Sequence, residues 1–282
     1  MPELPEVENV VVSLKKKVLG KTFVCSWVKN RKIDVDGIEG RKIKDVKRFG
    51  KNILFFLGGD KVLFVHLRMS GFFIFGRWSF TQKDFYENKI EEAKNTDLPE
   101  KKKFWQVVFF FDDDSMLALS DYRKFAKVVL MSAKEAEEKM SVLGPDPFLV
   151  SEKDFLEMFK KRKGAVKSLL MNQFFISGIG NIYASEILFL SGIDPRRKAN
   201  TLKEKNIKDI YYNTQKVLRK AITMKGDSTS DFRLVDGKKG GYQNNHLVYN
   251  QQKKLCPKCK KEEIKKIMFA GRGTYYCPRC QR

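Results

Sequence analysis

The spacing of apolar residues predicts a helix at the start of the chain. Val7, Val10, Val11 and Leu14 recur with the period of one helical face, so we expect a helix over residues 2–20. A helix with a single apolar face needs a partner surface to cover it, and this one is followed at once by a different pattern.

From about residue 23 to residue 131 the apolar residues form short runs rich in β-branched and aromatic side chains. The predicted strands are Asn52–Leu57, Val62–His66, Phe72–Phe75, Val107–Phe111 and Lys127–Met131. Turn signals such as Gly58-Gly59-Asp60 separate them. Several strands without intervening helices indicate a β-sandwich or a barrel.

The second half of the chain returns to helical spacing after Gly144-Pro145-Asp146-Pro147, which predicts a stiff, helix-breaking linker. The predicted helices are Asp154–Lys161, Ala165–Phe175, Asn181–Ser191 and Ile207–Thr223. A Gly-rich polar segment, residues 225–245, then leads into a cysteine-bearing tail. The expected domains are residues 1–143, a linker at 144–150, a helical domain at 151–245 and a small module at 246–282.

Charge is the first property that bears on function. Lys and Arg number 56 against 34 Asp and Glu, which leaves a net charge of +22. Such an excess repels itself in a compact fold, and a polyanion such as nucleic acid would relieve that repulsion. A basic protein without such a partner is the alternative. No apolar run is long enough for a transmembrane helix and the N-terminus lacks the pattern of a signal peptide, so the cytoplasm is the expected location.

Four of the five cysteines form two Cys-x-x-Cys pairs. They are Cys256, Cys259, Cys277 and Cys280, with seventeen residues between the pairs. Zinc binds four thiolates in a tetrahedron, and each Cys-x-x-Cys turn supplies two of them. The intervening runs Ile264–Met268 and Thr274–Tyr276 predict a β-hairpin. A redox pair is disfavoured, because it normally consists of one Cys-x-x-Cys near a βαβ unit.

The tail from Lys253 to Arg282 contains ten Lys or Arg and two Glu, a charge that suits contact with phosphates. Arg272 lies in the turn-like sequence Gly271-Arg272-Gly273-Thr274 and is the residue of the tail that we expect closest to a nucleic acid. A solvated turn residue is the alternative interpretation.

Two apolar helical stretches, Leu169–Gln173 and Ile176–Glu186, are joined through a glycine-rich turn. Backbone N–H groups in such a turn, at the start of the second helix, can point at a phosphate. Asn181 follows the turn, where its side chain either caps the second helix or donates to the phosphate.

The N-terminus carries a further possible chemistry. Removal of Met1 would expose Pro2 as a secondary amine whose ordinary pKa, near 8, is about two units below that of lysine. Such an amine can attack C1′ of a nucleotide and form an iminium, with Glu3 as acid and base on the sugar. The alternative is ordinary helix chemistry, because proline and the acidic Glu3 and Glu6 all suit a helix N-terminus.

In combination these motifs resemble the formamidopyrimidine-DNA glycosylase family from the first residue to the last. The resemblance rests on the start Pro2–Glu8, the turn and helix Gly178–Glu186 and the four-cysteine tail. It implies an α+β multidomain fold, in which an N-terminal β-sandwich with a catalytic N-terminal helix precedes a helix–two-turn–helix domain with a C-terminal zinc-finger β-hairpin.

The resemblance also implies roles for individual residues. Pro2 is the nucleophile, Glu3 the acid and base, Glu6 holds the opened sugar, and Lys51 contacts the phosphate or the damaged nucleotide. Met69 fills the hole left by a flipped base, Arg123 faces the orphaned base, and Phe125 wedges beside it. Asn181 and Arg272 match phosphate contacts, and Cys256, Cys259, Cys277 and Cys280 hold one structural Zn²⁺.

The match is incomplete at a few positions. Arg68 and Ala126 stand where the family has glycine, and Asn250 replaces a glycine after Tyr249. The segment Gly226–Phe232 follows the family's base-covering loop only loosely and is about one residue short.

We therefore expect a monomeric, zinc-containing DNA glycosylase/AP lyase of base excision repair that acts on double-stranded DNA with oxidised purines. Two alternatives stay open at this point. One is an endonuclease VIII-like enzyme for oxidised pyrimidines, and the other is a non-catalytic zinc-ribbon binder of damaged DNA.

Overall fold

The computed structural model describes residues 1–78, 102–160 and 162–282, and the end of the predicted helix Asp154–Lys161 lies outside them. The chain forms two compact units, Met1–Met140 with Lys225–Gly240, and Ser141–Met224 with Gly241–Arg282. The two units divide the chain differently from the predicted boundaries, because the N-terminal part of the first ends at Met140 and the second contains both the helices predicted after the linker and the cysteine-bearing tail. Residues 225–240 belong to the first unit, because Phe232 and Val235 are buried in its core.

The predicted N-terminal helix is present as α1 (Leu4–Val18). It begins two residues later than expected, with Glu3 as its N-cap and Pro5 in its first turn, where a missing N–H costs nothing. The chain leaves the helix at Leu19 and turns at Gly20, whose φ of +82° suits glycine. Pro2 therefore precedes the helix and takes no part in it.

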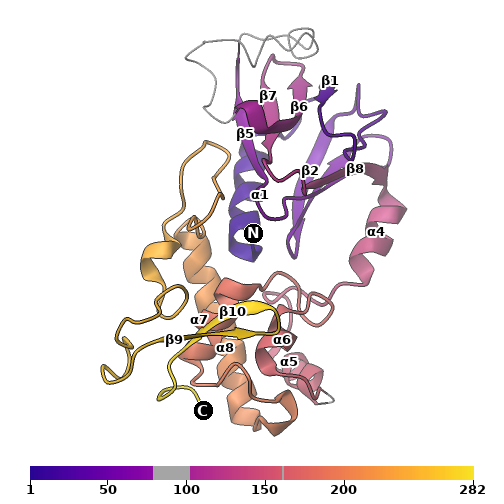
Figure 1. The fold of residues 1–282 in the computed structure, drawn as a ribbon. Helices are drawn as coiled ribbons and strands as arrows, with labels where there is room; N and C mark the ends of the chain where they lie inside the picture. The colour runs from indigo at the N-terminus through magenta and orange to yellow at the C-terminus, as the bar shows by residue number, and fades with distance from the viewer. Residues whose placement is uncertain (79–101, 161) are drawn as a thin grey trace. The chain divides into compact units, whose positions relative to one another are not determined.

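The first unit contains two four-stranded antiparallel sheets that form the predicted β-sandwich (Figure 1). One sheet has the order β1-β6-β7-β5, made of Phe23–Val28, Trp105–Phe111, Met116–Ser120 and Phe72–Gly76. The other has the order β2-β3-β4-β8, made of Ile43–Phe49, Asn52–Leu57, Lys61–His66 and Lys127–Ser132. The 3-10 turn η1 (Lys102–Phe104) leads into β6, and α4 (Ala133–Ser141) follows β8.

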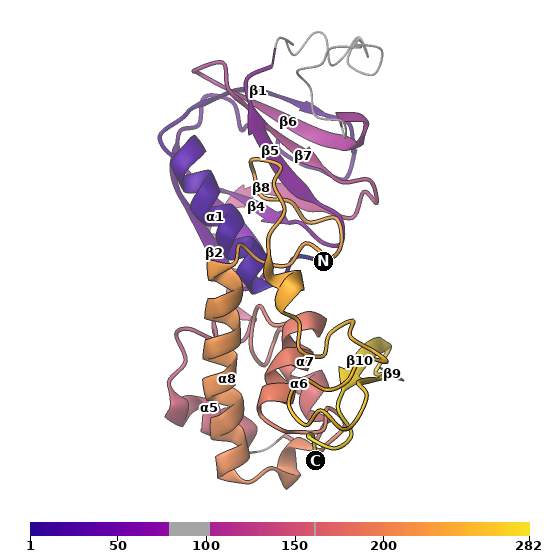
Figure 2. The ribbon, with the colours of Figure 1, turned by 90° about the vertical axis from the view of Figure 1, so that its left-hand side faces the viewer.

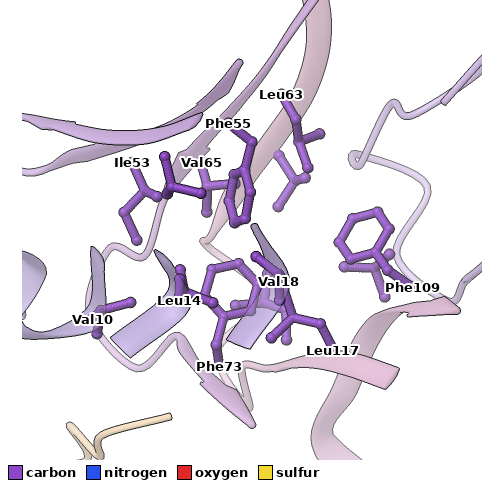
Figure 3. Packing of buried hydrophobic residues seen from close by; sticks show 14 of the residues in the cluster. Val10, Leu14, Val18, Ile53, Phe55, Leu63, Val65, Phe73, Phe109 and Leu117 are labelled. Atoms are coloured by element: carbon purple, nitrogen blue, oxygen red, sulfur yellow. The ribbon is translucent and has the colours of Figure 1, made fainter. Parts of the chain in front are cut away.

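One apolar core joins the two sheets and the buried face of α1. In Figure 3 three side chains of α1, Val10, Leu14 and Val18, lie among residues of both sheets. The neighbours labelled there are Ile53, Phe55, Leu63, Val65, Phe73, Phe109 and Leu117. The apolar residues that recur with a helical period in the sequence therefore form the face of α1 that packs into the core with both sheets.

The second unit is helical, with α5 (Glu152–Phe159), α6 (Val166–Met171), α7 (Asn181–Leu190) and α8 (Glu204–Thr223). Helix α8 packs against α5 and α7 (Figure 2). The short turns η2 (Ala199–Thr201) and η3 (Tyr242–Asn245) precede and follow α8. Among the helices of the described ranges, none is long and apolar enough to cross a bilayer.

The predicted helix Ala165–Phe175 is wrong at its end, because α6 stops at Met171. The Asn172 side chain accepts the N–H of Phe174 at 2.9 Å, which starts a turn instead of another helical residue. Gln173 then donates to the carbonyl of Ile179 at 2.8 Å and accepts the N–H of Gly178 at 2.9 Å. These bonds hold the two consecutive turns between α6 and α7.

The cysteine-bearing tail contains the expected hairpin, formed by β9 (Lys265–Phe269) and β10 (Arg272–Tyr276). Its connection is the two-residue turn Ala270-Gly271, and both residues have positive φ, +48° and +69°. Arg272 is thus the first residue of a strand instead of the turn residue that the sequence suggested.

Candidate functional site

The N-terminal site is built around the start of α1. Pro2 and Glu3 are buried, and both carboxylate oxygens of Glu6 accept backbone N–H groups. The N–H of Glu3 donates to Oε2 at 2.7 Å, and the N–H of Asp227 donates to Oε1 at 2.8 Å. A Cβ at Gly226 would lie 2.8 Å from Oε1, so glycine permits this approach. Glu6 therefore joins the residues beside Pro2 to the loop at 226–228. Its expected contact with the sugar stays a prediction.

Lys51 lies in the two-residue turn between β2 and β3, after Gly50 at φ +57°, and is only 6% exposed. Arg48 connects this turn to α1. Its Nε lies 2.5 Å from Oε2 of Glu8, and its Nη1 lies 3.4 Å from the carbonyl oxygen of Gly50. The structure thus holds the Lys51 turn against the helix that follows Pro2.

His66, at the end of β4, lies within the electrostatic influence of Lys51. Burial, together with the charges of Arg68 and Lys51, lowers the pKa of His66 to about 4. The imidazole is therefore neutral at pH 7, and its Nδ1 accepts the N–H of Arg68 at 3.0 Å. Arg68 itself has φ +55°, a left-handed conformation that favours glycine.

The three expected base-replacing residues lie on two loops of the first unit. Phe125 is 53% exposed, and the guanidinium carbon of Arg123 lies 4.9 Å from the centre of its ring. Met69 is half-buried. Phe125 is therefore not a residue of the hydrophobic core. Ser70, next to Met69, donates to the carboxylate of Asp121, which also accepts the N–H of Arg123 at 3.3 Å.

In the second unit Asn181 does not cap α7, because Gly180 is the N-cap residue and no side chain caps the helix. Instead its Nδ2 donates to the carbonyl of Gly273 at 3.0 Å, one residue after the exposed Arg272. The structure brings these two expected phosphate contacts together. The Oδ1 of Asn181 is buried and has no hydrogen-bond partner among the described residues.

A pocket of about 160 Å³ lies between α6 and the hairpin and is lined in part by Arg272 and Lys167. Lys167 is 1% exposed, and its Nζ donates to Oγ1 of Thr274 at 2.7 Å. This contact fixes the beginning of β10 against α6. The sequence offered no sign of it, since an isolated lysine in a basic chain reads as a surface residue.

The four tail cysteines form one cluster, in which all Sγ atoms lie within 4.8 Å of one another. Cys256 Sγ is 3.8 Å from Cys280 Sγ, and Cys259 Sγ is 3.8 Å from Cys277 Sγ. A tetrahedral zinc with Zn–S bonds of about 2.3 Å requires an edge of about 3.8 Å between sulfurs. The donor set therefore fits one Zn²⁺.

Hydrogen bonds tie the zinc module to the end of α7. The N–H of Cys277 donates to Oε1 of Gln281 at 2.9 Å, and Nε2 of Gln281 donates to the carbonyl of Ile193 at 2.9 Å. On α7, the carboxylate of Glu186 accepts three successive N–H groups, of residues 247–249, at 2.8–3.0 Å. Burial nevertheless raises the pKa of Glu186.

Three family models match consecutive parts of the chain. They describe the formamidopyrimidine-DNA glycosylase N-terminal domain at residues 1–128, the formamidopyrimidine-DNA glycosylase H2TH domain at 143–233, and a zinc finger found in FPG and IleRS at 253–282. Similar curated proteins are named formamidopyrimidine-DNA glycosylase. The one from Heliobacterium modesticaldum is 36% identical over 100% of both chains. The one from Mycoplasma mobile is 32% identical over 100% of this chain and 99% of its own.

The chain belongs to the formamidopyrimidine-DNA glycosylase family. A solved structure of the Lactococcus lactis Fpg mutant G226P, in complex with a Fapy-dG containing DNA, matches 100% of both chains with a TM-score of 0.86 and 30% identity. This match confirms the fold that we expected for the chain. The four cysteines lie within residues 253–282, which match the zinc-finger model. The zinc is structural, because four thiolates leave no open position on the metal.

Four positioning residues escaped the sequence interpretation. They are Arg48, Ser70, Asp121 and Glu186. Each lies within five residues of a residue that was given a role, namely Lys51, Met69, Arg123 or Asn181. The sequence did contain an indication for Asp121 and Glu186. An isolated acidic residue within an apolar or basic segment of so basic a chain is unusual and indicates a specific contact.

Proposed function

We propose that this family member is a bifunctional DNA glycosylase/AP lyase of base excision repair that removes oxidised purines, with Pro2 as its nucleophile. The observation that carries the proposal is the match to formamidopyrimidine-DNA glycosylases along the full length of both chains. The place of Pro2 supports it, since the residue precedes the N-cap of α1 and its nitrogen has no helical role.

In the proposed reaction, the Pro2 nitrogen of the processed chain attacks C1′ of the damaged nucleotide, and the bond from C1′ to the base breaks. The departing base takes a proton, and opening of the sugar leaves an iminium between Pro2 and C1′. Glu3 gives and takes protons on the sugar. Loss of a C2′ proton expels the 3′ phosphate, and a second elimination expels the 5′ phosphate, which leaves a one-nucleotide gap.

The exposed side chains of the first unit support the proposed eversion of the base. A flipped nucleotide leaves its neighbours unstacked, at a cost of a few kcal/mol. Met69 would fill the vacated space, Phe125 would wedge into the stack, and Arg123 would face the orphaned base. An aromatic ring left more than half exposed beside an arginine suits that task, because most of its apolar surface is available to stack on bases.

The proposed phosphate contacts are Asn181 and Arg272, and Lys51 in the catalytic site would contact the phosphate or the damaged nucleotide. Lys51 is held in a fixed turn, and the other two meet at Gly273. The zinc, held by the four cysteines, would stabilise the hairpin that presents Arg272. We further propose that the enzyme works as a monomer in the cytoplasm on chromosomal DNA, where reducing conditions keep the thiolates available to zinc.

Oxidised pyrimidines are the second candidate substrate class. One similar solved structure is a complex between the wild-type Lactococcus lactis Fpg and an oxidized pyrimidine containing DNA, with a TM-score of 0.84 and 31% identity. In this chain the segment Gly226–Phe232 follows the base-covering loop of the family only loosely. Both lesion classes therefore belong in the test.

The deciding experiment is borohydride trapping of the untagged protein on duplex DNA with 8-oxoguanine opposite cytosine, with Pro2→Gly as the control. We expect a covalent adduct that Pro2→Gly weakens or abolishes. An adduct only with an oxidised pyrimidine would overturn the purine assignment. No adduct with any lesion or abasic site, despite mass-verified removal of Met1 and bound zinc, would leave a non-catalytic binder.

A further inference from the structure

Asp121 occupies an unusual position in the first unit. Its side chain is completely buried, and it immediately follows β7 in a loop whose next four residues are exposed. One carboxylate oxygen accepts the hydroxyl of Ser70, and the other accepts the N–H of Ala126 at 2.7 Å. The N–H of Arg123 lies 3.3 Å from both the first oxygen and the Ser70 hydroxyl. All four contacts lie beneath the exposed surface of the loop.

These contacts join two loops that leave different sheets. The loop 121–126 follows β7 of one sheet, whereas the turn 67–71 follows β4 of the other. The turn is itself tight, because the N–H of Gly71 donates to the carbonyl of Leu67 at 3.0 Å and a Cβ there would lie 2.4 Å from that oxygen. Neither Met69 nor Phe125 is held by apolar packing alone, since both are at least partly exposed.

We infer that the buried Asp121–Ser70 pair positions Met69, Arg123 and Phe125 as one rigid unit for insertion into DNA. The inference rests on the proposed role of those three residues. Insertion replaces a lost base pair and its stacking, so its benefit depends on the three side chains entering together. A carboxylate hydrogen-bonded to backbone N–H groups from below can fix the loop without using the face that meets DNA.

The pair therefore determines specificity for damaged bases in duplex DNA. It contributes to the cleavage rate on duplexes in which a base must first be unpaired and unstacked. It contributes less where the base is already missing, because eversion at an abasic site has a smaller unstacking cost. A residue that only stabilised the fold would affect both substrates equally.

The test uses Ser70→Ala, which removes one hydroxyl from the buried carboxylate. Single-turnover cleavage is measured on two duplexes that differ only in carrying 8-oxoguanine or an abasic site. We expect the rate on the lesion duplex to fall about 10- to 100-fold, the size of a lost charge-assisted hydrogen bond. The rate on the abasic duplex should stay within about threefold of wild type. Fluorescence of 2-aminopurine beside the lesion should show less unstacking at saturating enzyme.

Ser115→Ala provides a matched control. Ser115 is equally buried, donates to Asp113 at 2.6 Å, and lies in the β6–β7 turn of the same unit. We expect it to leave the ratio of the two rates unchanged, whereas Ser70→Thr, which keeps the hydroxyl, should restore most of that ratio.

Equal losses on both duplexes, or no loss on either, would overturn the inference. Failure of the proposed function itself would look different, because the wild-type protein would then form no borohydride-trapped adduct on the abasic duplex.

Discussion

The arrangement around Glu6 predicts that Glu6→Gln weakens the link between the residues beside Pro2 and the loop that follows α8. The carboxylate is 1% exposed and accepts the N–H of Glu3 at one oxygen and the N–H of Asp227 at the other. A glutamine presents only one oxygen. Whichever way its amide turns, the NH₂ group faces a backbone N–H, so one hydrogen bond is replaced by a contact between two donors.

The expected size follows from the number and kind of bonds lost. A buried hydrogen bond to a charged group contributes about 1.5–3 kcal/mol, so the substitution should cost about 2 kcal/mol. If that cost falls on the geometry around Pro2, single-turnover cleavage of the 8-oxoguanine duplex should slow about 30-fold. Trypsin should also cut faster after the exposed Lys238 and Lys239, because the loop that carries them loses one of its attachments to the first unit.

Glu135→Gln is the control for this experiment. Glu135 lies in the same unit and also accepts a backbone N–H, that of Ser132 at 2.7 Å, but on the exposed surface. It should change neither the cleavage rate nor the tryptic rate. The reasoning is refuted if Glu6→Gln cleaves within threefold of wild type with unchanged proteolysis of the loop. A slower reaction with unchanged proteolysis would instead favour direct contact between Glu6 and the sugar.

Three further predictions concern pH, metal and the hairpin turn. The pKa of His66, about 4 when folded against an ordinary 6.5, means that the unfolded chain binds the extra proton first. This contribution to stability is present above pH 6.5 and lost as the pH falls through 4, about 2 kcal/mol of it by pH 5. Urea unfolding at pH 7 and pH 5 should therefore show a smaller difference for His66→Gln than for wild type. Metal analysis should find one zinc per chain, and Cys256→Ser should lose both the zinc and tight duplex binding, whereas retention of zinc would contradict the four-thiolate site. Ala270→Asn should raise the melting temperature of the zinc-loaded protein by a few degrees, because asparagine tolerates the φ of +48° better than alanine; a lower value would count against this explanation.

The regular parts of the fold were predictable because burial leaves a period in the sequence. The apolar face of α1 covers the sandwich, and the strands β3, β4, β5, β6 and β8 lie where alternating or continuous apolar runs predicted them. Strand β2 was not predicted individually, because four of its seven residues are charged and only Ile43 and Val46 are buried. Helix α4 buries only Ala136 and Met140, which is too little for a recognisable pattern.

The candidate site likewise contains contacts that the sequence predicts and contacts that it does not. The cysteine spacing sufficed for the zinc cluster, since each pair is local and one hairpin brings the pairs together. The long-range contacts were not predictable, because the partners of Glu6, Asp121 and Glu186 are backbone groups or small polar side chains far away in the chain. Backbone N–H groups leave no trace in the amino-acid pattern. A glycine that permits a close approach, such as Gly226, is an indirect indication of such a contact.

These three buried carboxylates share one physical purpose in a chain of net charge +22. A loop that must face DNA cannot bury large apolar side chains on that side, so packing alone does not fix its conformation. In each case a carboxylate beneath the loop accepts N–H groups, from Asp227, from Arg123 and Ala126, or from residues 247–249. A negative charge there also opposes the excess of positive charge at the surface. In the loop 121–126 the exposed side chains thus keep their outward face while the backbone is held from within, whereas at residues 247–249 the carboxylate adds to the apolar packing of Val248. On this view, replacing any of the three carboxylates should weaken the handling of DNA more than substituting an exposed acid of the same unit would.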